Sequence, residues 1–168
     1  MQDIVSHPQP NSRQHNLSDY VVKRMVLSPP NWRLYNLQIA LNWRTVKFVV
    51  SNASTIPQTG GVYTFLIQPG IARHPECSHL VYVGKTDNFR ARYRNYLREK
   101  RAGDQSTRPH VTDMLNKWDG FVWFCFAPIV ETDEIVPTED ALLAAYLPPT
   151  NKDFPATVSF DVRRLFGT

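Results

Sequence analysis

A dense group of basic and phenolic side chains lies between Leu80 and Leu97, in the stretch LVYVGKTDNFRARYRNYL. An apolar run ends there in Gly-Lys-Thr, and a segment rich in arginine and tyrosine follows. Guanidinium groups bind phosphate oxygens through two parallel hydrogen bonds, and a lysine adds a compact positive charge. The stretch therefore predicts a surface that binds a phosphate, and its surroundings must indicate which kind.

Two ordinary interpretations compete with phosphodiester chemistry. Gly-Lys-Thr behind a strand is also the end of a nucleotide-binding P-loop, but that motif requires a glycine five residues before the Gly-Lys pair, where His79 stands. An arginine-rich helix face is by itself more often a solvated surface than a binding site. The P-loop is disfavoured, and the arginines need support from elsewhere in the chain.

Four fragments supply that support through their residue types, order and spacing. They are GGVY with Gly61 and Tyr63, YVGK with Tyr82, Gly84 and Lys85, Arg92 ten residues after Tyr82, and Glu139 followed twelve residues later by Asn151. In this order the fragments resemble the GIY-YIG nuclease family, over roughly residues 57–151. The stretches STIPQTGGVYTFL and YVGKTDNFRARYRNYL are similar to the N-terminal incision domain of UvrC-type repair nucleases.

The resemblance implies a role for each matching side chain. Tyr63 and Tyr82 would face each other across adjacent strands, Arg92 would hold the scissile phosphate, Glu139 would be the single carboxylate ligand of Mg²⁺ or Mn²⁺, and Asn151 would brace the site from behind, with Gly61 and Gly84 in support. Lys85 matches a lysine of the repair branch, and Tyr96 stands where that branch has tyrosine and many other members have histidine.

The chemistry of these side chains suits phosphodiester hydrolysis, which needs an activated water and neutralised charge on the phosphate. Arg92 offers a bidentate donor, and Glu139 offers an oxygen ligand of the kind that Mg²⁺ prefers. Tyr63 is the predicted general base and Tyr82 the alternative, because basic neighbours and a metal would favour a phenolate. Tyr96 lies one helical turn from Arg92, within reach of the same phosphate.

Each of these roles has a structural alternative. A strand tyrosine is often only a packed aromatic, Glu139 could simply favour a helix N-terminus, and Asn151 could be a turn residue. A second set of basic residues shares another face of the predicted helix and is expected to contact DNA phosphates outside the reacting one. This set consists of Arg90, Arg94, Arg98 and Arg101.

The sequence also predicts the elements that position these residues. Strands are expected in GGVYTFLI, HLVYVG and FVWFCFAPI. Three helices are expected: one from an Asp87 or Asn88 cap to about Arg101, one from Thr107 to Trp118, and one from a Thr138 cap to the Pro148-Pro149 pair. Residues 37–50 suggest strands or a short helix, and Pro29-Pro30 and residues 51–61 suggest turns. The loop from Gln68 to His79 is longer than in compact family members, and Val62 and Val83 replace isoleucines.

We therefore expect an α+β fold, with a small, mostly antiparallel sheet flanked by helices. Residues 1–18 are expected to form a mobile N-terminal arm, 19–56 an extension packed on the core, and 57–168 the nuclease-like domain. The chain has 168 residues, of which 42% are hydrophobic, so a real core is expected. The net charge of +4 leans weakly toward an acidic partner.

Two cysteines without metal-site spacing, the lack of a signal-peptide pattern and the lack of a membrane-length apolar run predict a cytoplasmic protein without a membrane partner. The predicted function is a Mg²⁺-dependent endonuclease that cuts DNA. The alternatives are an RNA-cleaving nuclease and a non-catalytic nucleic-acid-binding subunit on a nuclease scaffold. Expected partners are DNA or RNA, and other subunits of a repair, mobile-element or defence assembly.

Overall fold

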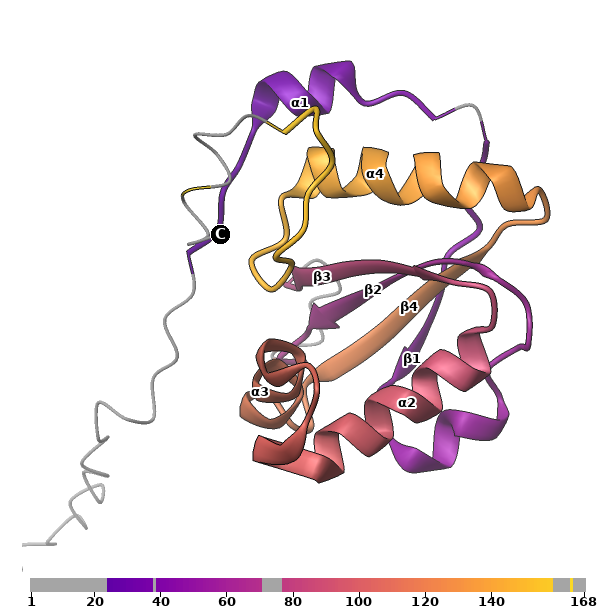
Figure 1. Ribbon diagram of the computed structural model, residues 1–168, viewed down its shortest axis with the longest axis vertical. Coiled ribbons are helices and arrows are strands. Elements are labelled where there is room, and N and C mark those ends of the chain that lie inside the picture. The colour runs from indigo at the N-terminus through magenta and orange to yellow at the C-terminus, as the bar shows by residue number, and fades with distance from the viewer. Residues whose placement is uncertain (1–23, 38, 71–76, 159–163, 165–168) are drawn as a thin grey trace, which may run out of the picture.

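The computed structural model of the protein describes residues 24–37, 39–70, 77–158 and 164 (Figure 1). In chain order the elements are α1 (Pro29–Leu34), β1 (Arg44–Lys47), the 3₁₀ helix η2 (Val50–Ser54), β2 (Gly61–Ile67), β3 (His79–Thr86), α2 (Phe89–Ala102), η4 (Gly103–Gln105), α3 (Pro109–Lys117), β4 (Val122–Pro128), η5 (Thr132–Glu134) and α4 (Ile135–Tyr146). The predicted arm, residues 1–18, lies outside the described residues.

A four-stranded sheet in the order β1-β4-β2-β3 forms the centre of the fold, and all three strand pairs are antiparallel. The prediction of a small α+β fold is confirmed. The extension predicted over residues 19–56 contributes β1, which pairs with β4 at one edge of the same sheet. The opposite edge is β3, the strand that carries the YVGK fragment.

Helices cover both faces of the sheet, with α2 and α3 on one side and α4 on the other (Figure 1). The face toward α2 and α3 is mostly aromatic and includes Tyr63, Phe65 and Phe124. The face toward α4 is aliphatic and includes Val62 and Val83. Alternating residues of β2 therefore serve two different cores, as the two-residue period of a strand requires.

Helix α2 begins and packs as the sequence predicts. The Asn88 side chain accepts a hydrogen bond from the backbone N–H of Ala91 at 3.0 Å, which is a standard N-cap. Phe89, Tyr93 and Tyr96 are buried on one side, at the expected helical spacing. The helix ends at Ala102, one residue beyond the expected Arg101.

Helix α3 begins at Pro109, two residues after the expected Thr107, and two other helix starts differ more from the prediction. Helix α4 begins at Ile135 rather than after a Thr138 cap, and Thr138 is fully buried inside the helix. Burial of Ile135 against the aliphatic core adds this first turn, and Pro137 is tolerated there because the N–H groups of a first turn have no helical partner. The Pro29-Pro30 pair, predicted as a turn, opens α1 instead, since the fixed φ of proline suits the first helical position.

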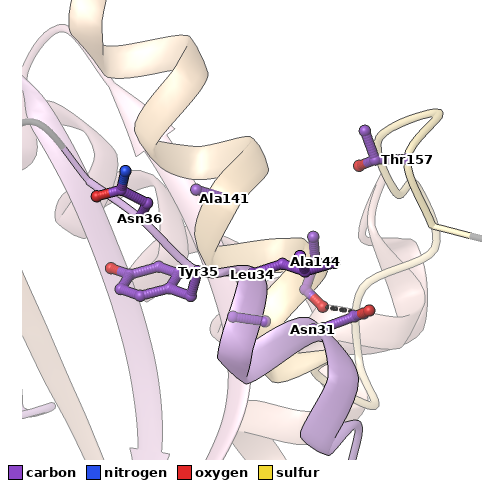
Figure 2. A pocket seen from close by; sticks show the side chains of 8 residues that line it. Asn31, Leu34, Tyr35, Asn36, Ala141, Ala144 and Thr157 are labelled. Carbon is purple, nitrogen blue, oxygen red and sulfur yellow. Dashed lines mark hydrogen bonds between the residues drawn. The ribbon is translucent and has the colours of Figure 1, made fainter.

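Helix α1 lies against α4 and is held there by side chains that reach backbone carbonyls. Asn31 Nδ2 donates to the Ala144 carbonyl at 2.7 Å, as drawn in Figure 2, and Trp32 Nε1 donates to the Ala145 carbonyl at 2.8 Å. None of the helices in the described ranges is long and apolar enough to cross a membrane.

Candidate active site

A cleft of about 400 Å³ opens at the β3 edge of the sheet, where elements from both faces meet. Strand β3 contributes Tyr82 and Lys85, α4 contributes Glu139, the loop after α4 contributes Asn151, and Arg108 joins them from the start of α3. Four residues that the sequence predicted as site residues thus line one cleft, although up to 69 positions of chain separate them. The cleft is the candidate active site.

Lys85 and Glu139 form an ion pair across the cleft, with Lys85 Nζ donating to Glu139 Oε2. Only 12% of the Glu139 side chain is exposed, against 42% for Lys85. No group of three or more histidine, cysteine or acidic side chains suited to a metal occurs among the described residues. Asp140 and Asp153 also line the cleft, but they do not form a metal-ligating group with Glu139. A single carboxylate ligand fits Mg²⁺, which keeps several waters and needs few protein ligands, better than it fits a metal held in a full protein cage.

Three tyrosines predicted for the site, Tyr63, Tyr82 and Tyr96, meet on the α2 and α3 side of the sheet, with Tyr82 at the cleft and the other two behind it. Tyr63 and Tyr82 stack with ring centroids 6.3 Å apart and planes 28° apart. Their strands place Tyr63 opposite Gly84 and Tyr82 opposite Phe65, so the two tyrosines are diagonal neighbours on the same face. The Tyr63 and Tyr96 hydroxyl oxygens are 2.8 Å apart and hydrogen bonded.

Steric constraints explain why glycine occupies both predicted supporting positions, Gly61 and Gly84. A Cβ on Gly84 would lie 2.6 Å from the Tyr63 hydroxyl oxygen, so any other residue would displace that phenol. Gly61 has a φ of +146°, and a Cβ there would lie 2.2 Å from the Ala127 carbonyl oxygen of β4. The glycines of GGVY and YVGK therefore make room for the phenol and for close strand packing.

Burial changes the acid–base character of the inner tyrosines. It raises the pKa of Tyr63 well above its ordinary value, the neighbouring Tyr96 and Tyr82 add to this rise, and Arg92 opposes it. Burial also raises the pKa of Tyr96, with Tyr82 adding and Arg108 opposing. Tyr63 is only 1% exposed, and this burial disfavours its phenolate more strongly than Arg92 favours it.

Asn151 holds the backbone of β3 from the outer edge of the sheet. Its Oδ1 accepts from the Val83 N–H at 3.0 Å, and its Nδ2 donates to the Val83 carbonyl at 2.8 Å. The Thr150 N–H also donates to the Val81 carbonyl at 3.0 Å. An edge strand has unpaired backbone groups, and these contacts satisfy them at Val83, between Tyr82 and the Gly84-Lys85 pair.

Arg92 does not line the cleft, although it is close enough to Tyr63 to lower the pKa of that phenol. Its guanidinium makes no hydrogen bond to any other side chain or backbone group of the described ranges. It is half-buried on α2, four residues before Tyr96, which leaves its donors available to a ligand. Arg92 thus stands on the tyrosine side of the candidate site rather than on the Glu139 side.

The second arginine face of α2 is divided in the structure. Arg90 Nε donates to the Ile56 carbonyl at 2.7 Å, so this side chain also ties α2 to the segment before β2. Arg94, Arg98 and Arg101 surround a separate, open hollow of about 490 Å³ beside η2. Arg98 also donates to Asn95 on its own helix.

Sequence reasoning missed Arg108, which lies among the tyrosines. Its Nη2 donates to the Tyr82 hydroxyl at 2.6 Å and its Nη1 donates to the Tyr96 hydroxyl at 3.1 Å. Pro109 marks a helix start, so the sequence could have placed Arg108 at the N-cap of α3. Nothing in the local pattern indicates that this helix start packs against Tyr82, 26 residues away.

A further hollow of about 260 Å³ lies between α1 and α4, with the side chains of Asn31, Leu34 and Tyr35 on one side and small α4 residues on the other (Figure 2). None of the predicted site residues lines it. No protein-family model and no curated protein sequence matches the chain. The likeness to GIY-YIG nucleases therefore stays a prediction, based on motif spacing.

Proposed function

We propose that the protein is a metal-dependent endonuclease that hydrolyses phosphodiester bonds in DNA at the β3-edge cleft. The observation that carries this proposal is the convergence of Tyr82, Lys85 and Glu139 on one cleft from two elements on different layers of the fold. A phenol, a basic side chain and a carboxylate are together groups that metal-assisted phosphodiester hydrolysis can use.

Tyr82 is the better general base of the two stacked tyrosines. Tyr82 lines the cleft, whereas Tyr63 is buried behind it and engaged with Tyr96. A base must lie within hydrogen-bond reach of the water that it activates, so geometry decides before acidity does. Tyr63 acts instead as an inner support whose hydroxyl fixes Tyr96.

The charged residues divide the remaining work. Glu139 would hold Mg²⁺ or Mn²⁺, and the bound ion would neutralise charge on the phosphate as a Lewis acid. The Lys85 side chain is 42% exposed, so its ammonium can donate to a phosphate oxygen in the cleft as well as to Glu139. Arg92 stands beside the cleft near Tyr63, and its guanidinium makes no hydrogen bond within the described ranges, so it would reach in and bind the phosphate by two hydrogen bonds.

Cleavage of supercoiled plasmid tests this proposal. The purified chain should nick the plasmid with Mg²⁺ and leave it intact with EDTA. Single-stranded DNA and RNA of the same sequence are tested as substrates in parallel with the plasmid. Cleavage of RNA alone would make the protein a ribonuclease, and binding without cleavage of any of the three would make it a nucleic-acid-binding subunit.

A further inference from the structure

Arg108 contacts two of the candidate site's tyrosines directly. Its guanidinium bridges the Tyr82 and Tyr96 hydroxyls, and its central carbon lies 5.7 and 5.5 Å from the centroids of the same two rings. The side chain also lines the cleft. It therefore connects the cleft-facing phenol of β3 to the buried phenol of α2.

A second set of contacts holds Arg108 in place from behind. Its backbone N–H donates to Ser106 Oγ at 3.0 Å, and Ser106 Oγ in turn donates to Glu99 and is 2.7 Å from Thr112 Oγ1. These hydrogen bonds join α2, the turn before α3 and α3 itself. The backbone that carries Arg108 is thus anchored at the junction of two helices, and the two tyrosine hydroxyls fix the guanidinium itself.

The bridge restricts where the phenol protons go. A guanidinium only donates, so the Tyr82 and Tyr96 oxygens must both act as acceptors toward Arg108. Tyr96 is further engaged by Tyr63, whereas the Tyr82 oxygen keeps a lone pair that can accept from a partner in the cleft. Arg108 therefore aims the Tyr82 oxygen without exchanging a proton with it.

Charge adds to this geometric effect. Burial alone would lower the pKa of Arg108, but the Tyr96 and Tyr82 phenols outweigh burial and raise it, so the side chain stays a cation. A fixed cation 2.6 Å from the Tyr82 oxygen attracts the negative charge that this oxygen must carry, as a phenolate, before it can accept a proton from water.

From these contacts we infer that Arg108 is a positioning residue of the proposed nuclease, which acts on the reaction through Tyr82 rather than by touching the phosphate. The inference rests on the proposed function. It assigns to the start of α3 a role that none of the four motif fragments contains.

A matched pair of substitutions separates this role from simple packing. Arg108→Met keeps an apolar stem without the charge, and Arg108→Lys keeps the charge with a single donor group. Single-turnover cleavage at saturating DNA should fall by on the order of a hundredfold in Arg108→Met, as for other preorganised donors, and Arg108→Lys should recover at least about tenfold of that loss. The dissociation constant for DNA should change less than about threefold in both.

Three controls make each outcome decisive. Arg33→Met, the same change on the exposed surface of α1, should cut like wild type. Thermal unfolding checks that the variants fold, and Ser106→Ala, which weakens the anchor without removing Arg108, should give a smaller loss of rate in the same direction. Two results would overturn the inference: equal cleavage rates for Arg108→Met and Arg108→Lys, or a loss of DNA affinity as large as the loss of rate. The proposed nuclease function would still stand in either case, provided that the wild-type protein cuts. Wild-type protein that cuts none of the nucleic acids would overturn both.

Discussion

At the scale of single residues, Tyr63 and Tyr82 have different proposed roles because their surroundings differ. Tyr63 is enclosed, bonded to Tyr96 and kept neutral by burial. Tyr82 lies one strand further out, where the sheet ends and the cleft begins. Sequence alone ranked them the other way, because both stand in similar strand contexts and exposure to the cleft depends on which strand is the edge.

Arg92→Ala should damage turnover far more than binding. Its guanidinium is expected to grip the phosphate more strongly as negative charge builds up, and only such differential contacts accelerate the chemical step. Loss of one donor of this kind lowers the rate by on the order of a hundredfold to a thousandfold. Single-turnover cleavage measured beside a binding titration on the same DNA separates the two effects.

Two variants serve as controls for Arg92. Arg92→Lys should recover only part of the rate, since an ammonium cannot make the bidentate contact. Arg94→Ala removes an exposed arginine two residues away, and it should leave the cleavage rate at saturating DNA near wild type. If Arg92→Ala cuts at the wild-type rate once saturated with DNA, Arg92 is only an anchoring residue.

At the scale of elements, the sequence predicts best where local signals and burial agree. Helix α2 follows from the Asn88 cap and from apolar residues at helical spacing, and the structure reproduces both. Helix α4 begins a turn early because Ile135 packs into a core that no local signal announces. For the same reason Arg108 was missed, since its partners Tyr82 and Tyr96 come from other elements.

The meeting of Lys85 with Glu139 has a different origin. Neither periodicity nor spacing brings β3 and α4 together, since 54 positions separate the two residues. Their joint placement was expected from the motif resemblance alone. Sequence therefore supplied the residues of the site, and the sheet order β1-β4-β2-β3 supplies the edge at which they meet.

The outer face of α2 should contribute to DNA affinity rather than to the chemical step. Arg94 and Arg98 line a hollow that shares no residue with the cleft, so they can reach only neighbouring phosphates. Each lost phosphate contact should lower the slope of log affinity against log salt by about 0.9. The measurement is a salt titration of DNA binding by the double variant Arg94→Ala, Arg98→Ala.

The matched control replaces two exposed arginines elsewhere, Arg33 on α1 and Arg44 on β1, by alanine. This second double variant removes the same charge from other surfaces. A specific interface predicts a smaller salt slope for the Arg94 and Arg98 pair only. If both double variants have the same salt slope of DNA binding, the arginine face of α2 is only a solvated surface.

At the scale of the whole molecule, the aromatic layer between the sheet and α2 stabilises the fold and makes that stability sensitive to alkali. Tyr93 is fully buried, accepts from the Val49 N–H at 2.9 Å and donates to the Val49 carbonyl at 2.8 Å. Burial raises its pKa to about 12, and the Val49 hydrogen bond opposes the rise. A raised tyrosine pKa means that its stabilising contribution is complete below the unfolded pKa, about 10, and declines above it.

Tyr93→Phe should therefore be less stable than wild type at neutral pH, by about 1–3 kcal/mol for the unpaired Val49 N–H. The difference in unfolding free energy between wild type and Tyr93→Phe should narrow as pH rises, because only the wild type loses the contribution of the Tyr93 hydroxyl. The expected change is about 1.4 kcal/mol per pH unit between the unfolded and the folded pKa of Tyr93. Urea unfolding across that range measures it, with Tyr146→Phe on the exposed surface as the control. A difference that stays constant from neutral to alkaline pH would contradict the role given to burial.

The candidate site itself is a property of the whole fold, because Glu139 belongs to the layer on one face of the sheet and the tyrosines to the layer on the other. Glu139→Gln tests that arrangement most directly, with Glu131→Gln, the same change at an exposed position, as its control. Single-turnover cleavage of plasmid at saturating Mg²⁺ is the measurement. Loss of a metal ligand that stabilises charge by several kcal/mol should lower the rate by about a hundredfold or more, while the fold and DNA binding persist. A folded Glu139→Gln protein that cuts at the wild-type rate with Mg²⁺ would contradict the central claim.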